Sequence, residues 1–245
     1  MKNLLLILFL VPIAFSGWSQ NSFTQGAGKT YNIRMNAGKE TGATYVWMVT
    51  PEEGTSTNLG AVSGNSANVV WDGPAGYYTL SVQVNDGNGC LSEPITQEVE
   101  ILAPGSLIFD AVYPNTTICS DLSGGVEGSD PANSESIFRI AYTGNANLTS
   151  AVVTIKNPDG DFIDLNGYVL SDQNNPGITT ANDGADKEID FVAADRWENS
   201  GTTNAVFEIT LVSAKTADGA VLSAVPSADI KRTISVLTKP AIQFN

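Results

Sequence analysis

The densest set of side chains that could do chemistry lies at residues 157–167, which read NPDGDFIDLNG. Ca²⁺ binds about six to eight oxygen ligands held on a turning backbone. The spacing departs from the EF-hand loop, because Ile163 takes the third ligand position and no glutamate closes the run. Asp-Gly is also the sequence of an ordinary hairpin turn. The run therefore predicts either a Ca²⁺ site or a plain turn, and no other cofactor is expected. The candidate ligands are Asp159, Asp161, Asp164 and Asn166.

Cys90 and Cys119 are the only two cysteines in the chain. In an exported protein a disulfide between them is the default expectation. It would close a loop of about 30 residues, stabilise the fold by roughly 3 kcal/mol and fix the angle between the two halves of the chain. Two separate thiols, or bonds to a partner, are the alternative, since sequence spacing does not set the Cα separation that a disulfide requires.

Two pairs of carboxylates could support acid–base hydrolysis, Glu52 with Glu53 and Glu98 with Glu100. Glycoside hydrolysis needs two carboxyl groups facing each other across a cleft. Glu98 and Glu100 share one face of a strand, but like charges on a solvated face are the usual origin of such pairs. The chain has no histidine, which excludes Ser-His-Asp catalysis and His-ligated zinc. We expect no catalytic residue and a protein that is not an enzyme.

The charge balance also excludes one class of partner. The chain has 12 Lys and Arg against 26 Asp and Glu, a net charge of −14. Nucleic-acid binding needs clustered basic residues that displace counterions, and an anionic membrane surface would repel the chain. We therefore expect no nucleic acid among its partners.

Residues 1–19 have the features of a signal peptide. Lys2 supplies a positive start, residues 4–15 form an apolar run, and the small residues Gly17 and Ser19 precede an expected cut before Gln20. The run is shorter than the about 20 residues that span a bilayer. No second long apolar run follows. The sequence predicts export and no transmembrane segment in the mature chain.

The elements that would position these groups are short β-strands. Apolar residues recur with period 2, as at 78–84 and 206–212, and turn residues interrupt the pattern every 8 to 12 positions. Asn-Gly and Asp-Gly pairs supply hairpin turns. Ala103-Pro104-Gly105 ends one strand and redirects the chain. The sequence predicts an all-β protein of two immunoglobulin-like antiparallel β-sandwich domains in tandem, residues 21–103 and a loop-rich 106–245.

The first of these predicted domains also carries a family likeness. The residues are Y-x-W-x-V-x-P at 45–51, Trp71, G-x-Y-T-L-x-V at 76–82 and N-D-x-x-G-C-x-S at 85–92. Together they resemble the PKD-like domain, an immunoglobulin-like sandwich of Bacteroidota surface proteins that include gliding and type IX secretion-associated ones. The resemblance covers residues 31–102, about a third of the chain. The glycine-aspartate turn that commonly follows the tryptophan in that family is absent, and residues 51–54 read PEEG instead.

The likeness and the period-2 pattern together assign a core. Trp47 is expected between two packed sheets, and Trp71 belongs to the same predicted core. Tyr78 stands where its hydroxyl can pin a corner while Leu80 fills the interior. The alternative is that Trp47 and Tyr78 are exposed and stack on a ligand, as aromatic residues do in sugar-binding modules.

The predicted function is adhesion or assembly within a bacterial cell envelope, by a non-enzymatic protein. Its partner would be an envelope or outer-membrane protein, and its location the periplasm, the outer membrane or the cell surface. Long polar loops in the second half, with the neighbouring Trp197, are the expected contact region. A carbohydrate-binding module is the alternative and would show an exposed aromatic platform at Trp197 or Tyr168, so that a glycan is a second candidate ligand. A carboxylate-based glycan hydrolase is the third reading.

Overall fold

The structure is a computed structural model that describes residues 21–33, 42–62, 65–119, 136–165, 169–170, 177–193, 197, 199 and 201–238. These residues form β-strands and one short 3₁₀ turn, η1 (Ala228–Ile230), with no α-helix among them. No helix in this part of the chain has the length and apolar character needed to cross a membrane. The all-β fold class predicted from the sequence is confirmed. The predicted signal peptide, residues 1–19, lies outside the described residues.

Seven strands form the N-terminal unit, defined here as the described part of residues 21–102. They pair as a five-stranded sheet in the order β1-β7-β6-β3-β4 and a two-stranded sheet, β2-β5. β1 runs parallel to β7, whereas the other neighbours are antiparallel. The strands are β1 (Asn21–Thr24), β2 (Ala27–Asn32), β3 (Thr44–Pro51), β4 (Thr57–Val62), β5 (Ser66–Trp71), β6 (Gly76–Asn85) and β7 (Ile95–Leu102).

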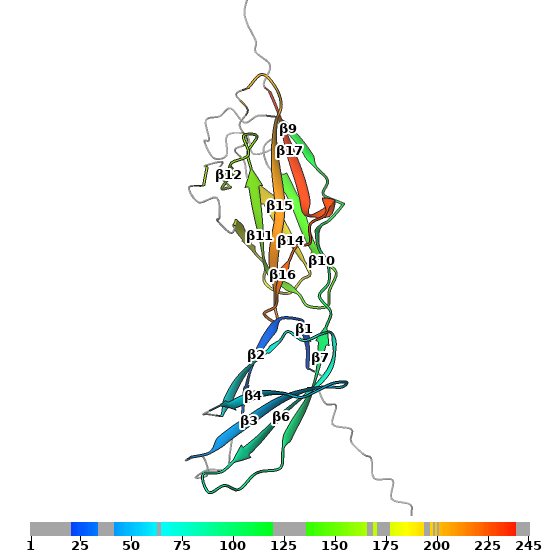
Figure 1. Ribbon diagram of the computed structural model, residues 1–245. Coiled ribbons are helices and arrows are strands. Elements are labelled where there is room, and N and C mark those ends of the chain that lie inside the picture. The colour runs from blue at the N-terminus through cyan, green and yellow to red at the C-terminus, as the bar shows by residue number, and fades with distance from the viewer. Residues whose placement is uncertain are drawn as a thin grey trace, which may run out of the picture.

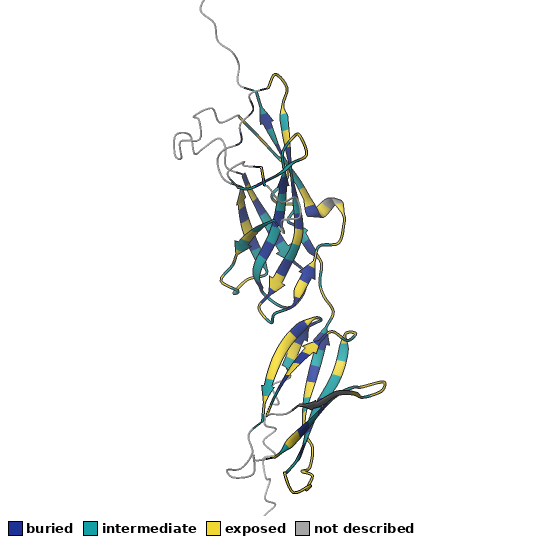
Figure 2. Ribbon diagram, turned by 60° about the vertical axis from the view of Figure 1, so that its left-hand side comes forward, coloured by how far each residue is buried: buried dark blue, intermediate teal, exposed yellow. Residues whose placement is uncertain are grey.

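The core of the N-terminal unit lies between these two sheets. In β6 the side chains of Leu80, Val82 and Val84 are buried, and the residues between them are partly exposed. Figure 2 shows this alternation as stripes of buried and exposed residues along the strands. Because side chains of a strand alternate between its faces, a period-2 sequence places one apolar set against the opposite sheet. Trp47 faces Val82 in the β3–β6 register, so the largest side chain of β3 enters the same core.

The C-terminal unit, the described part of residues 107–238, has two further sheets. One has the order β14-β10-β8, and the other β12-β11-β15-β17-β9, with β13 paired to β11 and β16 to β15. β17 runs antiparallel to β15 and parallel to β9. The strands are β8 (Leu107–Phe109), β9 (Thr116–Cys119), β10 (Ser136–Tyr142), β11 (Leu148–Lys156), β12 (Phe162–Ile163), β13 (Ile178–Ala181), β14 (Glu188–Ala193), β15 (Ala205–Thr216), β16 (Val221–Ser223) and β17 (Lys231–Leu237).

The core of the C-terminal unit is built by the same rule. Phe207, Ile209 and Leu211 of β15 are buried, whereas Val206 and Val212 on the other face are exposed. These residues join a separate cluster of buried side chains from the two sheets of the unit. The change from the first cluster to the second falls between Ile101 and Leu107. The predicted immunoglobulin-like packing of β-sheets is confirmed, and the sheets are antiparallel apart from the parallel pairs β1–β7 and β17–β9.

The two units meet end to end, and the turn between β15 and β16 lies against the N-terminal unit (Figure 1). Ala220, in that turn, is fully buried and belongs to the N-terminal cluster. The backbone N–H of Thr24 donates to Oδ2 of Asp218 at 2.6 Å. Gly219 has a φ of +93°, which favours glycine and lets the turn close tightly. A hairpin of one unit thus completes the core of the other.

Candidate functional site

The tryptophans predicted for the core are buried. Trp47 and Trp71 are each 1% exposed, and Leu80 is buried beside them. Trp71 is stacked on Phe23, with ring centroids 6.1 Å apart, and meets Tyr78 edge-on at 6.3 Å. These aromatic rings support the sandwich and are not available to stack on a ligand.

Tyr78 is half-buried and anchors the turn between β5 and β6. Its ring packs against the N-terminal core, and its hydroxyl donates to the carbonyl oxygen of Pro74 at 2.8 Å. The bond holds the turn between β5 and β6 against the sheet. Tyr78 therefore has both an apolar contact and a satisfied polar group, the combination that suits a tyrosine at the edge of a core.

The predicted disulfide between Cys90 and Cys119 is wrong for this structure, in which both thiols are free and exposed. Cys90 lies in the connection between β6 and β7, and Cys119 is the last residue of β9. These segments lie at opposite ends of the molecule (Figure 1). A disulfide requires Cα atoms within about 7 Å, and the end-to-end arrangement of the units prevents that approach.

The acidic run at residues 157–165 forms a turn between β11 and β12. The N–H of Asp161 donates to Oδ1 of Asn157 at 2.8 Å, and the N–H of Asn157 to the carbonyl oxygen of Asp161 at 2.9 Å. Gly160 has a φ of +89°. Within the described residues no group of three or more acidic or cysteine side chains is arranged to hold a metal ion. Asn166 lies outside those residues, and Ca²⁺ at this run stays a prediction.

The carboxylate pairs named as candidates for hydrolysis lie side by side. Glu52 and Glu53 are exposed in the segment after β3. Glu98 and Glu100 are on the outward face of β7, where Glu100 accepts a hydrogen bond from Oγ of Ser22 at 3.0 Å. Two carboxyl groups on one strand face do not enclose a sugar ring between them, which is the arrangement that glycoside hydrolysis needs.

Trp197 does not form the exposed platform proposed for a carbohydrate-binding module. It is buried in the C-terminal core, and its ring meets Phe207 edge-on with centroids 4.7 Å apart. Tyr168 lies outside the described residues. In the part of the chain that the structure describes, Tyr77 is the large aromatic side chain that is exposed.

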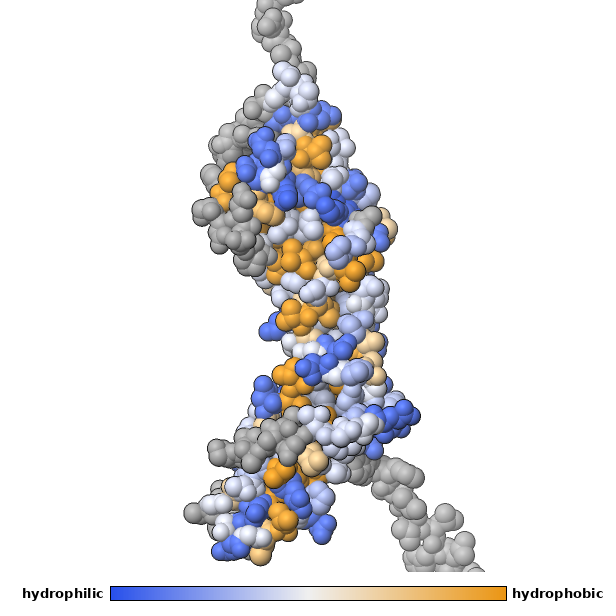
Figure 3. Space-filling view, in the orientation of Figure 1, coloured by the Kyte–Doolittle hydropathy of each residue, from blue (hydrophilic) through white to orange (hydrophobic). Residues whose placement is uncertain are grey.

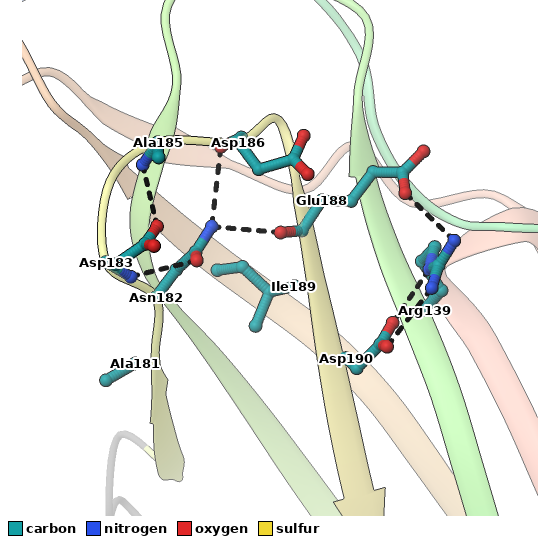
Figure 4. Close-up of a pocket in the computed structure, with 9 residues that line it drawn as sticks. All are labelled: Arg139, Ala181, Asn182, Asp183, Ala185, Asp186, Glu188, Ile189 and Asp190. Carbon is teal, nitrogen blue, oxygen red and sulfur yellow. Dashed lines mark hydrogen bonds and ion pairs between the residues drawn. The ribbon is translucent and has the colours of Figure 1, made fainter.

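The most elaborate polar site among the described residues is a shallow pocket beside β14 (Figure 4). Arg139 of β10 donates two hydrogen bonds to the carboxylate of Asp190 of β14, from Nε to Oδ1 at 2.7 Å and from Nη2 to Oδ2 at 3.1 Å. Its Nη1 also contacts Oε2 of Glu188 at 3.0 Å. The guanidinium lies 5.1 Å from the ring centre of Tyr113. One arginine thereby pairs with two carboxylates of the neighbouring strand.

The electrostatics of this pocket follow from that geometry. The hydrogen bonds from Arg139 lower the pKa of Asp190, and the bond to Asp190 raises the pKa of Arg139. Both side chains face solvent, where a salt bridge stabilises a fold only weakly. The pair therefore links β10 to β14 on the outward face of the sheet.

The other wall of the pocket is the turn from Asn182 to Lys187. Nδ2 of Asn182 donates to the carbonyl oxygen of Glu188 at 2.9 Å, and its Oδ1 accepts from the N–H of Asp183 at 2.9 Å. Oδ1 of Asp183 accepts from Ala185, and Oδ1 of Asp186 from Lys187. Figure 4 shows the side chains of Asn182 and Asp183 bonded to backbone atoms of the turn and of Glu188. The turn uses these oxygen atoms to hold its own shape.

Cross-strand pairing explains why the sequence did not reveal the contact between Arg139 and Asp190. Arg139 and Asp190 are 51 residues apart, and they meet because β10 and β14 are neighbours with these two residues in register. The alternation of polar and apolar residues in each strand could have placed both on an outward face. It could not have paired the strands.

Comparison with known proteins gives a limited result. No protein-family model matches the chain, and no curated protein matches it. Among solved structures 96 chains match. One is described as fibronectin(III)-like modules of CbhA from Clostridium thermocellum, with a TM-score of 0.36 and 10% identity over 94% of this chain and 98% of that chain. The likeness to PKD-like domains of Bacteroidota stays a prediction.

Proposed function

We propose that the protein is a non-enzymatic spacer or assembly component of a bacterial cell envelope, exported by its predicted leader at residues 1–19. The observation that carries this proposal is the junction between the units. Ala220 of one unit is buried in the core of the other, and Asp218 accepts the N–H of Thr24. A spacer must hold its ends at a fixed separation, and a shared core provides this.

Further hydrogen bonds support a stiff connection. The N–H of Gly105 donates to the hydroxyl oxygen of Tyr142 at 3.1 Å, and the N–H of Ser106 to Oγ1 of Thr143 at 2.8 Å. These contacts tie the linking segment to β10 and the residue after it. Unanchored linkers let domains move independently, so the anchored linker favours a structural role. The partner is proposed to be an envelope or outer-membrane protein that contacts loop tips and sheet edges.

The test is crosslinked affinity purification of the tagged full chain from its native envelope, followed by mass spectrometry. A partner protein from the envelope, recovered in stoichiometric amount, supports the assembly function. Recovery of the protein alone, without any partner, overturns it and favours the glycan-binding alternative, which a glycan array would then examine. The control is the same tag on an unrelated exported protein, which removes partners that bind the tag or matrix.

A further inference from the structure

A groove of about 620 Å³ opens where the two units meet. The linker and β8 form one side, and β16 with the residues after it forms the other. The N-terminal unit closes one end with Gln25 and Asp72. The arginine pocket described above is a separate site on the outward face of β14.

The first side of the groove is a strand edge with free backbone groups. The N–H of Asp110 donates to the carbonyl oxygen of Arg139, and the N–H of Thr143 to that of Ser106. Antiparallel ladders alternate, so residues between these bonded positions direct their N–H and C=O away from β10. Phe109 is one of them, and its carbonyl oxygen accepts a hydrogen bond from Arg232. Leu107 is the other, and no described residue bonds to its backbone across the groove.

The second side repeats the arrangement. The N–H of Thr216 donates to the carbonyl oxygen of Ala220, and the N–H of Ala224 to that of Val212. By the same alternation, Val221 and Ser223 direct their backbone groups away from β15. No described residue meets them there. The groove thus has free backbone groups at Leu107 on one side and at Val221 and Ser223 on the other.

Exposed apolar side chains lie beside these backbone groups. Val221 is 68% exposed and Val225 is 75% exposed, and both line the groove. Hydrophobic surface gathers just above the waist of the molecule (Figure 3). Apolar groups beside unpaired strand edges are the features by which proteins accept an added strand.

The charge of the groove selects the occupant. Asp72 and Asp229 line it, and none of the described residues that line it is lysine or arginine. The whole chain carries a net charge of −14, so a second copy would be repelled. A chain with basic side chains would be attracted.

We infer that the groove accepts an extended segment of a partner protein in which apolar and basic residues alternate, bound as a strand between β8 and β16. Its backbone pairs with Leu107 on one side and with Val221 and Ser223 on the other. Its apolar residues cover Val221 and Val225, and its lysines or arginines face Asp72 and Asp229. The inference rests on the proposed assembly function and names the surface that performs it.

The test uses the full mature chain and a blocked decapeptide in which valine alternates with lysine. Fluorescence anisotropy measures its affinity, and amide hydrogen exchange followed by NMR reports on Leu107, Val221 and Ser223. Saturable binding that slows exchange at these three amides supports the inference. A decapeptide of alternating valine and glutamate should bind at least tenfold more weakly, because it meets Asp72 and Asp229. Equal binding of the two peptides, or no saturable binding, overturns it.

Matched variants separate this groove from general stickiness. Val221→Ser with Val225→Ser should weaken binding by about tenfold, because two apolar contacts are lost. Val112→Ser changes an equally exposed valine, 75% exposed and outside the groove, and should leave binding unchanged. Asp72→Asn should weaken binding of the valine–lysine peptide, whereas Asp159→Asn, at an exposed position outside the groove, should leave that binding unchanged. Unchanged binding in the double valine variant overturns the inference.

Two further results assign a failure to its source. Slowed exchange at the three amides in the protein alone, increasing with its concentration, would identify a second copy as the occupant and overturn the inference. If wild type and the double valine variant capture an envelope partner equally, the assembly function is supported and the inference that the groove binds this partner is overturned. If the peptide binds the groove but no envelope partner is captured, the groove inference is supported and the proposed assembly function is overturned.

Discussion

Thr24 in the first strand and Asp218 in a hairpin of the second unit are 194 residues apart and joined by a 2.6 Å hydrogen bond from N–H to Oδ2. Thr24 is buried, so water does not readily replace this acceptor. Thr216 donates its hydroxyl to the other oxygen of the same carboxylate. A single carboxylate therefore joins the hairpin to the strand it rests on.

Asp218→Ala should destabilise the protein and loosen its junction. A buried N–H left without a partner costs about 1–3 kcal/mol. Urea unfolding measures the loss, and small-angle scattering should show a wider spread of particle lengths than for wild type. Asp159→Ala, in an exposed turn, is the control and should change stability by less than about 0.5 kcal/mol. Identical scattering curves for Asp218→Ala and wild type would contradict a rigid junction.

Arg232→Met should destabilise the C-terminal unit. The guanidinium donates to the carbonyl oxygens of Tyr113, Phe109 and Asp110 at 3.0, 2.9 and 3.1 Å. Burial lowers the pKa of Arg232, with the charges of Asp229 and Asp110 opposing the shift. Hydrogen bonds to charged groups stabilise by about 1.5–3 kcal/mol each, and their sum is not additive, so we expect a loss of about 2–3 kcal/mol in thermal or urea unfolding.

The neighbouring lysine provides the comparison for that measurement. Lys231 pairs with Glu208 on the surface, its side chain 50% exposed. Lys231→Met should change the free energy of unfolding by less than about 1 kcal/mol, as for other exposed ion pairs. Similar losses for the two variants would show that the carbonyl contacts of Arg232 do not hold the β8–β9 connection in place.

Trp71→Ala should destabilise the N-terminal unit by about 3–5 kcal/mol, because it empties the centre of an aromatic cluster. Phe23, Tyr31 and Tyr78 all contact its ring. Equilibrium unfolding followed by fluorescence measures the loss. Tyr77→Ala removes a half-exposed ring nearby and should cost much less. A smaller loss for Trp71→Ala than for Tyr77→Ala would contradict the packing described.

Thiol chemistry should reveal two reactive cysteines and no internal bridge. Because Cys90 and Cys119 are exposed and free, a thiol reagent should label two groups in the folded protein. A reductant should leave the melting temperature unchanged. Cys90→Ser and Cys119→Ser should each stay within about 0.5 kcal/mol of wild type. A fall in melting temperature on reduction, at constant monomer content, would restore the disulfide predicted from the sequence.

The ion pair between Arg139 and Asp190 should make a small, acid-sensitive contribution to stability. The pKa of Asp190 is lowered in the folded state from 3.8. Its contribution is therefore present above pH 3.8 and is lost as the pH falls through the lower, folded value. Wild type should be more stable than Asp190→Asn at pH 7 and low salt, and the two should converge in acid. Added salt should reduce the difference, and a difference that grows in acid would contradict this linkage.

The strands themselves could be predicted because each needs only local information. Period-2 alternation in 78–84 and 206–212 assigns Leu80 and Ile209 to a buried face, and this is where they lie. The Asp218-Gly219 pair reads as a hairpin turn, and β15 and β16 flank it. Extended backbone makes alternate side chains face opposite ways, so the pattern survives whatever the strand later pairs with.

The contacts between distant strands could not be predicted, and the cysteines show why. Cys90 and Cys119 are near in sequence, but the first lies in the β6–β7 connection and the second on β9, at opposite ends of the molecule (Figure 1). Trp197 stands in a polar segment that suggested exposure, yet it is buried in the C-terminal core. Sequence distance and local polarity do not report which surfaces come to face each other.

By itself the sequence determined the all-β class, the alternating core positions such as Trp47 and Leu80, and the absence of histidine chemistry. Each of these depends on residue identity and on the geometry of a single strand. Only the tertiary structure decided that Arg139 meets Asp190, that Ala220 fills the core of the other unit, and that β8 and β16 border one groove. Those contacts depend on strand order and on the packing of one unit against the other, which many segments set jointly and no single segment encodes.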